Sequence, residues 1–146
     1  MSKLSTSNVF RIMIADDDAD DRDFIQSALL SIDKNIDSVF THDGDELMQR
    51  LHLRIGTDRL PDVILLDLNM AKKSGIEVLK ELRLDNTLCE IPVTILTGSV
   101  DPHMIREAYG YGAQGYILKP VSQAGWELLM RELLESWKQI PILPVV

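Results

Sequence analysis

The segment VFRIMIADDDADDRD at residues 9–23 joins a short apolar run to a dense cluster of acidic residues. Residues 9–15 are mostly apolar, and a run of this length that ends in a turn signal is typical of a buried β-strand. Six of the eight residues at 16–23 are aspartates. Ligands of open α/β sheets bind outside the carboxyl ends of the strands. The segment therefore predicts a strand with an acidic site at its carboxyl end.

The aspartate run divides into two parts. Asp20, Asp21 and Asp23 suit the first turn of a helix, whose dipole favours negative charge, whereas Asp18 could serve either part. Asp16 and Asp17 directly follow the strand, and neighbouring carboxylates in a crevice repel each other unless a cation lies among them. Carboxylate oxygens suit Mg²⁺ or Ca²⁺. We therefore expect Asp16 and Asp17 to hold a divalent cation.

Composition limits the function further. The chain has 146 residues, 45% of them hydrophobic, and a net charge of −8, which argues against direct binding of nucleic acid. The single cysteine, Cys89, cannot form an internal disulfide, so a reducing cytoplasm is the expected location. We expect no membrane span and no signal peptide, because no long apolar run occurs and the start MSKLSTSN lacks an apolar core.

Short apolar runs alternate with helical periods along the whole chain. Five strands are predicted, and each is followed by a helix; the strands lie at residues 9–15, 38–41, 63–66, 92–96 and 115–118, and the helices begin near residues 20, 43, 75, 102 and 122. This alternation predicts a doubly wound α/β fold, in which helices cover both faces of a five-stranded parallel sheet. Right-handed crossovers bring the carboxyl end of every strand to one edge of the sheet.

Chemically active side chains gather at this edge. Asp16 and Asp17 follow the first strand, and the later strands end at Asp67, Thr97 and Lys119. A metal on the two aspartates could bridge to a phosphate at Asp67, while the hydroxyl and the ammonium bind its other oxygens. An aspartate is a competent nucleophile for forming an acyl phosphate. Mg²⁺ is preferred over Ca²⁺ because phosphate sites typically share it between carboxylates and phosphate oxygens.

At these residues the chain resembles the receiver domains of response regulators in two-component signalling, over about residues 10–138. The resemblance implies a flavodoxin-like sheet with strand order 2-1-3-4-5. It makes Asp67 the phosphoacceptor, Thr97 the switch hydroxyl and Tyr116 a switch aromatic, and it adds a cis peptide bond between Lys119 and Pro120. Metal ligands would be Asp16, Asp17, Asp67 and the backbone carbonyl of Asn69.

The resemblance also carries expectations about partners. A sensor histidine kinase would supply the phosphoryl group, and a subfamily resemblance suggests the phytochrome type. The downstream protein is not specified. The chain would be a single stand-alone receiver with its core at about residues 9–139, and it would be a phosphoacceptor rather than an enzyme. The apolar tail at residues 140–146 and Trp137, near the expected exposed end of the last helix, favour a homodimer, whereas Trp126 has core spacing. Ala71 departs from the family pattern, which has proline there.

Three alternatives stay open. A Mg²⁺-dependent phosphatase of the haloacid-dehalogenase type would form its aspartyl phosphate at Asp16, after the first strand. A flavodoxin-like binding module needs a phosphate loop there, and the aspartates would repel that ligand. A receiver could also act in protein interaction without being phosphorylated.

Overall fold

The structure is a computed structural model that describes residues 9–139. Its five strands form one parallel sheet in the order β2-β1-β3-β4-β5. The strands are β1 (Phe10–Ala15), β2 (Ile36–Thr41), β3 (Val63–Leu66), β4 (Val93–Thr97) and β5 (Gly115–Leu118). The doubly wound α/β fold and the strand order are therefore confirmed. β2 begins two residues earlier than the sequence predicts, because Ile36 and Asp37 pair with Phe10 and Arg11 of β1.

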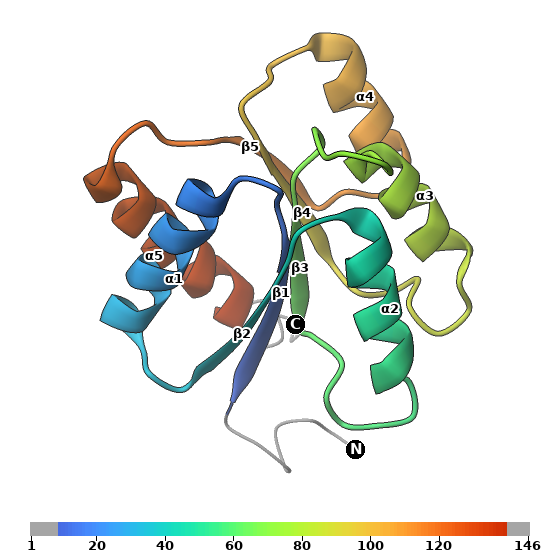
Figure 1. The fold of residues 1–146 in the computed structure, drawn as a ribbon, viewed down its shortest axis with the longest axis horizontal. Coiled ribbons are helices and arrows are strands. Elements are labelled where there is room, and N and C mark those ends of the chain that lie inside the picture. Colours follow the sequence, from blue (N-terminus) through green and yellow to red (C-terminus); the bar gives the residue numbers. More distant parts are fainter. Residues whose placement is uncertain (1–8, 140–146) are drawn as a thin grey trace, which may run out of the picture.

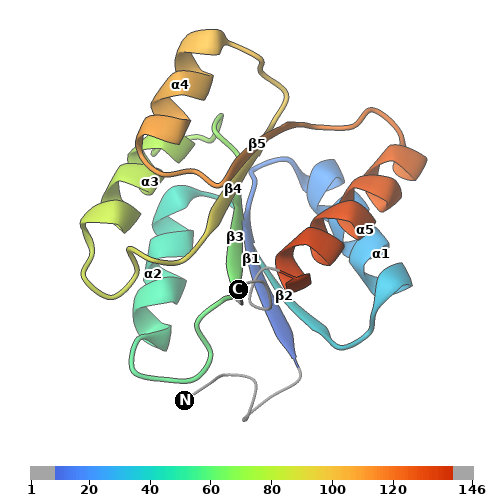
Figure 2. The ribbon, with the colours of Figure 1, turned by 180° about the vertical axis from the view of Figure 1, so that it is seen from behind.

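Five helices cover the two faces of the sheet (Figures 1 and 2). Helices α1 (Ala19–Ile32) and α5 (Gln123–Gln139) lie on one face, and α2 (Gly44–Arg54), α3 (Gly75–Leu84) and α4 (Pro102–Gly110) lie on the other. The chain winds from β1 to the edge strand β2 and then back across β1 to β3. Such a reversal between β1 and β3 is the switch point at which doubly wound folds bind ligands.

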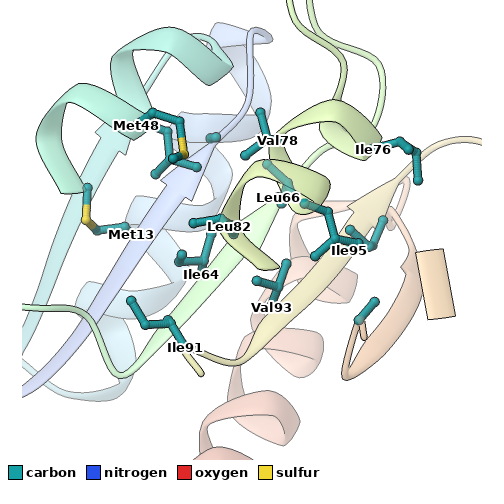
Figure 3. Packing of buried hydrophobic residues seen from close by; sticks show 14 of the residues in the cluster. Met13, Met48, Ile64, Leu66, Ile76, Val78, Leu82, Ile91, Val93 and Ile95 are labelled. Carbon is teal, nitrogen blue, oxygen red and sulfur yellow. The ribbon is translucent and has the colours of Figure 1, made fainter. Parts of the chain in front are cut away.

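Alternate residues of the central strands build two separate cores. Met13, Ile64, Leu66, Val93 and Ile95 pack against α2 and α3, where Figure 3 shows Met48, Val78 and Leu82 lying over the strands. The opposite side chains of the strands pack against α1 and α5 around Trp126, which is 1% exposed. Burial on both faces explains why these strands are almost continuously apolar. The prediction that Trp126 lies in the core is confirmed.

Short polar side chains begin the helices, and Asp18, which the sequence leaves open, belongs to the helix. The carboxylate of Asp18 accepts hydrogen bonds from the backbone N–H groups of Asp20 and Asp21, at 2.9 and 3.1 Å. Asp18 is therefore the N-cap of α1 and satisfies donors that the first turn leaves free. Asp43, Ser74 and Asp101 cap α2, α3 and α4 in the same way.

Two expectations about particular residues are wrong. Trp137 is only 6% exposed, and its ring stacks on Phe10 with the ring centroids 6.3 Å apart, so it does not offer an exposed contact for a dimer. The tail at residues 140–146 lies outside the described residues. No peptide bond within residues 9–139 is cis, so the bond between Lys119 and Pro120 is trans. Lys119 nevertheless reaches the carboxylates at the sheet edge, since its N–H holds the strand end by donating to the Thr97 carbonyl at 2.8 Å.

Gly75, the first residue of α3, lies directly against the end of β3. A Cβ atom at this position would overlap the carbonyl oxygen of Asp67 and lie 2.7 Å from the Cα of Leu68. The Gly75 N–H also donates to the Leu68 carbonyl at 3.0 Å. Because the neighbours are backbone atoms, no side-chain rotation can make room. This glycine therefore allows the loop after β3 to fold back against the residue that ends the strand.

We expect Gly75→Ala to lower the free energy of unfolding by about 2 kcal/mol, the usual cost of forcing a methyl group into a packed site. Chemical denaturation measures the change. Gly110→Ala is the control, because a Cβ at Gly110 would meet nothing within 4 Å. Equal stability of the two variants would show that the close approach at Gly75 imposes no constraint.

Candidate functional site

The carboxyl ends of β1 and β3 place two buried carboxylates side by side. Asp16 and Asp67 are 2% and 4% exposed, and each is fixed by a backbone bond within the sheet edge. The N–H of Asp16 donates to the Thr41 carbonyl at 3.1 Å, and the N–H of Asp67 donates to the Ala15 carbonyl at 3.0 Å. Arg22 of α1 also donates from Nη1 to the backbone carbonyl of Asp16 at 2.7 Å. The two carboxylates thus stand in a rigid frame.

Lys119, which follows β5, supplies the cation of this site. Its Nζ lies 3.0 Å from Oδ2 of Asp16, 3.1 Å from Oδ2 of Asp67 and 2.7 Å from Oδ2 of Asp21. Burial alone would lower the pKa of Lys119, but the hydrogen bonds to Asp21 and Asp16 and the charges of Asp16 and Asp67 outweigh it and raise that pKa. The ammonium therefore stays charged and partly neutralises the buried carboxylates.

A divalent cation would also fit this site. Asp16, Asp17 and Asp67 each offer a carboxylate oxygen, and the three oxygens lie within 4.8 Å of one another. Asp17 is exposed, so the cluster opens toward solvent. Carboxylate oxygens are typical ligands of Mg²⁺, whose remaining positions are filled by waters and phosphate oxygens. A metal contact to the Asn69 carbonyl stays a prediction.

Thr97, Asn69, Ser99 and Tyr116 form a connected polar chain beside the carboxylates. Oγ1 of Thr97, at the end of β4, accepts from Nδ2 of Asn69 and from the N–H of Ser99, both at 3.4 Å. The N–H of Asn69 donates to Oδ1 of Asp67 at 3.2 Å, and the Tyr116 hydroxyl donates to the Ser99 carbonyl at 2.9 Å. These hydrogen bonds connect the end of β3 to the end of β4, and the end of β4 to β5.

A family model described as the response regulator receiver domain matches residues 12–142. The chain belongs to the response regulator receiver family. The family consists of signalling proteins of two-component systems, and it is not a classic enzyme family.

Curated and solved relatives agree with this family. The chemotaxis protein CheY-3 of Vibrio cholerae is 31% identical over 114 residues, which cover 78% of this receiver and 83% of CheY-3. The probable methanogenesis regulatory protein FilR2 of Methanothrix harundinacea is 35% identical over 96 residues, which are 65% of this chain but only 62% of FilR2. The phosphorylated cyanobacterial phytochrome response regulator RcpA is 32% identical with a TM-score of 0.82, covering 90% of this chain and 95% of RcpA.

Two site residues were not recognised from the sequence. The sequence pattern places Asp21 in the helix alone, yet Asp21 makes the shortest of the three carboxylate contacts to Lys119. Arg22 had no assigned role, yet it holds the backbone of Asp16. Their position on the turn that follows the first acidic pair is the signal that could have identified them.

Within residues 9–139, no helix of this receiver is long and apolar enough to cross a membrane.

The pKa of Asp16 predicts how binding of a divalent cation responds to pH. Burial raises this pKa to about 6, although the Asp18 N–H and Lys119 oppose the shift, and the charge of Asp67 adds to it. Protons therefore compete with the metal below about pH 6. We expect Mg²⁺ affinity, measured by isothermal titration calorimetry, to fall roughly tenfold per pH unit in that range.

The stability of the metal-free protein changes with pH in the opposite direction to its Mg²⁺ affinity. Because the folded state binds this proton more tightly than the unfolded state, metal-free protein gains stability from Asp16 as the pH falls through about 6. Asp16→Asn removes the titrating group and should remove both pH dependences near that value. An unchanged Mg²⁺ affinity across this range in the unmodified chain would contradict the assignment.

Proposed function

We propose that this receiver accepts a phosphoryl group on Asp67 from a sensor histidine kinase, in a reaction that requires Mg²⁺, and thereby changes its affinity for a downstream protein. The observation that carries the proposal is the place of Asp67. Its carboxylate ends a buried strand, faces two further carboxylates that suit a metal, and accepts a hydrogen bond from the Lys119 ammonium.

In the proposed reaction an oxygen of the Asp67 carboxylate attacks phosphorus. A phosphorus–oxygen bond forms on Asp67 while the bond to the donor breaks, and the electron pair of that bond leaves with the imidazole of the kinase histidine or with acetate from acetyl phosphate. Asp16, Asp17 and Asp67 would hold Mg²⁺ together with the Asn69 carbonyl, and the metal would neutralise charge on the transferred group. Lys119 would bind another phosphoryl oxygen, which favours the transition state electrostatically.

The polar side chains from Thr97 to Tyr116 would couple phosphorylation of Asp67 to a change at the protein surface. Thr97 Oγ1 accepts two weak hydrogen bonds and keeps its own proton to donate. When that proton binds a phosphoryl oxygen, the loop after β4 would move with it, and the Ser99 carbonyl would change its bond to Tyr116. The surface formed by α4, β5 and α5 would then favour one of two states.

Relatives support the kinase and metal parts of the proposal. RcpA is described as phosphorylated and as a phytochrome response regulator, and Rcp1, a fold neighbour at 24% identity, is described as bound to Mn²⁺. A phytochrome-type histidine kinase is therefore the proposed donor, and the cytoplasm, where such kinases act, is the proposed location.

Acetyl phosphate tests the proposal without any kinase. In the presence of Mg²⁺, intact-mass spectrometry should find a species heavier by one phosphoryl group, and EDTA should prevent its formation. Equal labelling with and without Mg²⁺ would contradict the metal requirement. Failure to label at any Mg²⁺ concentration, in protein shown to be folded, would count against phosphorylation and favour a receiver that acts through protein interaction alone.

A further inference from the structure

Asp21 lies beside Lys119, although it is no part of the strand-end pattern. It belongs to the first turn of α1, and its Oδ2 is 2.7 Å from Nζ of Lys119. The side chains are 20% and 14% exposed, so solvent screens the pair only in part. An ammonium has three N–H donors, and here the three nearest acceptors are Asp21, Asp16 and Asp67.

The three carboxylates differ in what else they can bind. Asp16 and Asp67 belong to the oxygen cluster that suits a metal, whereas the clusters found within residues 9–139 do not include Asp21. A divalent cation in that cluster would draw on two of the partners of Lys119 and would repel its ammonium. A lysine side chain has a flexible four-carbon stem and a strongly hydrated ammonium, so it moves into water readily. When Asp16 and Asp67 bind the metal, Asp21 would remain available as the ion-pair partner of Lys119.

We infer that Asp21 is a positioning residue that keeps the Lys119 ammonium at Asp67 while a divalent cation occupies the carboxylate cluster. This inference rests on the proposed function. It explains why one acidic residue of the first turn faces the sheet edge while its neighbours Asp20 and Asp23 are exposed. Asp21 is not a member of the metal cluster, and it acts through its ion pair with Lys119.

The first test compares Asp21→Asn with Asp20→Asn, which removes the same charge one residue away. With saturating Mg²⁺ and acetyl phosphate, we expect Asp21→Asn to lower the rate of phosphorylation roughly tenfold, the value of one charge-assisted hydrogen bond. Asp20→Asn should stay within about twofold of the unmodified chain. Asp21→Glu, which keeps the carboxylate, should recover part of the rate. Equal rates for the two asparagine variants would overturn the inference.

A double-mutant cycle separates positioning from a general structural effect. In a Lys119→Met background, Asp21→Asn should cause no further loss of rate, because its only route of action is gone. A further tenfold loss in that background would overturn the inference, since Asp21 would then act independently of Lys119. Thermal unfolding of each variant confirms that the compared proteins are folded.

A second readout does not depend on phosphorylation. In Mg²⁺, acetic anhydride should modify Lys119 several-fold faster in Asp21→Asn than in Asp20→Asn, because the ammonium is released toward water; peptide mass spectrometry measures the rate. Equal modification would overturn the inference even if no variant were phosphorylated. If the unmodified chain takes up no phosphoryl group while Lys119 is released as expected, the proposed function fails and the positioning role stands.

Discussion

Asp67→Asn is expected to abolish phosphoryl uptake, with a loss of at least about a hundredfold in rate, because the amide oxygen of asparagine is a poor nucleophile compared with a carboxylate. The fold should persist, since asparagine has the same shape and its amide oxygen can still accept the Asn69 N–H, which donates to Oδ1 of Asp67 in this structure. Transfer of radiolabelled phosphate from a histidine kinase, in Mg²⁺, measures the loss.

Asp62→Asn is the matched control for this loss. Asp62 lies at the opposite end of β3, where its carboxylate accepts a hydrogen bond from the Arg11 N–H at 2.8 Å. Its replacement also removes one negative charge, but at the end of β3 that is distant from the site. This change should leave phosphoryl uptake unchanged. Labelling of Asp67→Asn at the rate of the control would show that the phosphoryl group is accepted elsewhere.

Lys119→Met is expected to have two effects of opposite sign. In EDTA at pH 8, the free energy of unfolding should fall by about 2–4 kcal/mol, because the buried carboxylates of Asp16 and Asp67 lose their cationic partner. The cost is limited because Lys119 holds the pKa of Asp16 down, so its loss would raise that pKa further and let Asp16 take up a proton. Mg²⁺ should recover much of this stability and should bind more tightly than to the unmodified chain, since the competing ammonium is gone.

Phosphorylation of Lys119→Met should be slower by about a hundredfold or more, the usual cost of removing a group that stabilises charge in the transition state. Lys138→Met is the control, because Lys138 forms a surface ion pair with Asp33 at 3.2 Å and its side chain is 44% exposed. That change should alter stability by less than about 0.5 kcal/mol. Equal stability of the two variants in EDTA would contradict the role of Lys119 as the internal cation.

The sequence allowed the fold and most of the site to be predicted because both depend on local pattern. Apolar runs marked β1, β3 and β5, and the parallel arrangement then required their carboxyl ends to meet at one edge, which brought Asp16, Asp67 and Lys119 together. Neither step needs knowledge of how side chains pack. The strand ends were therefore accessible to reasoning from residue types alone.

Residues whose roles depend on packing between distant elements were missed. Asp21 meets Lys119 only because the first turn of α1 and the residue after β5 come together at the carboxyl edge of the sheet, although 98 residues separate them in the chain. Trp137 was expected to be exposed because it lies near the end of α5, but Phe10 at the start of β1 covers its ring. In both cases the deciding partner lies at the other end of the chain, and helical periodicity carries no information about it.

The site of the phosphoryl group tests the central claim most directly. After treatment with acetyl phosphate and Mg²⁺, borohydride reduction converts an aspartyl phosphate to homoserine, and tandem mass spectrometry identifies the residue changed. We predict homoserine at position 67 and at no other aspartate. Homoserine at position 16 would contradict the account, because it would place the nucleophile after the first strand, as in a phosphatase of the haloacid-dehalogenase type.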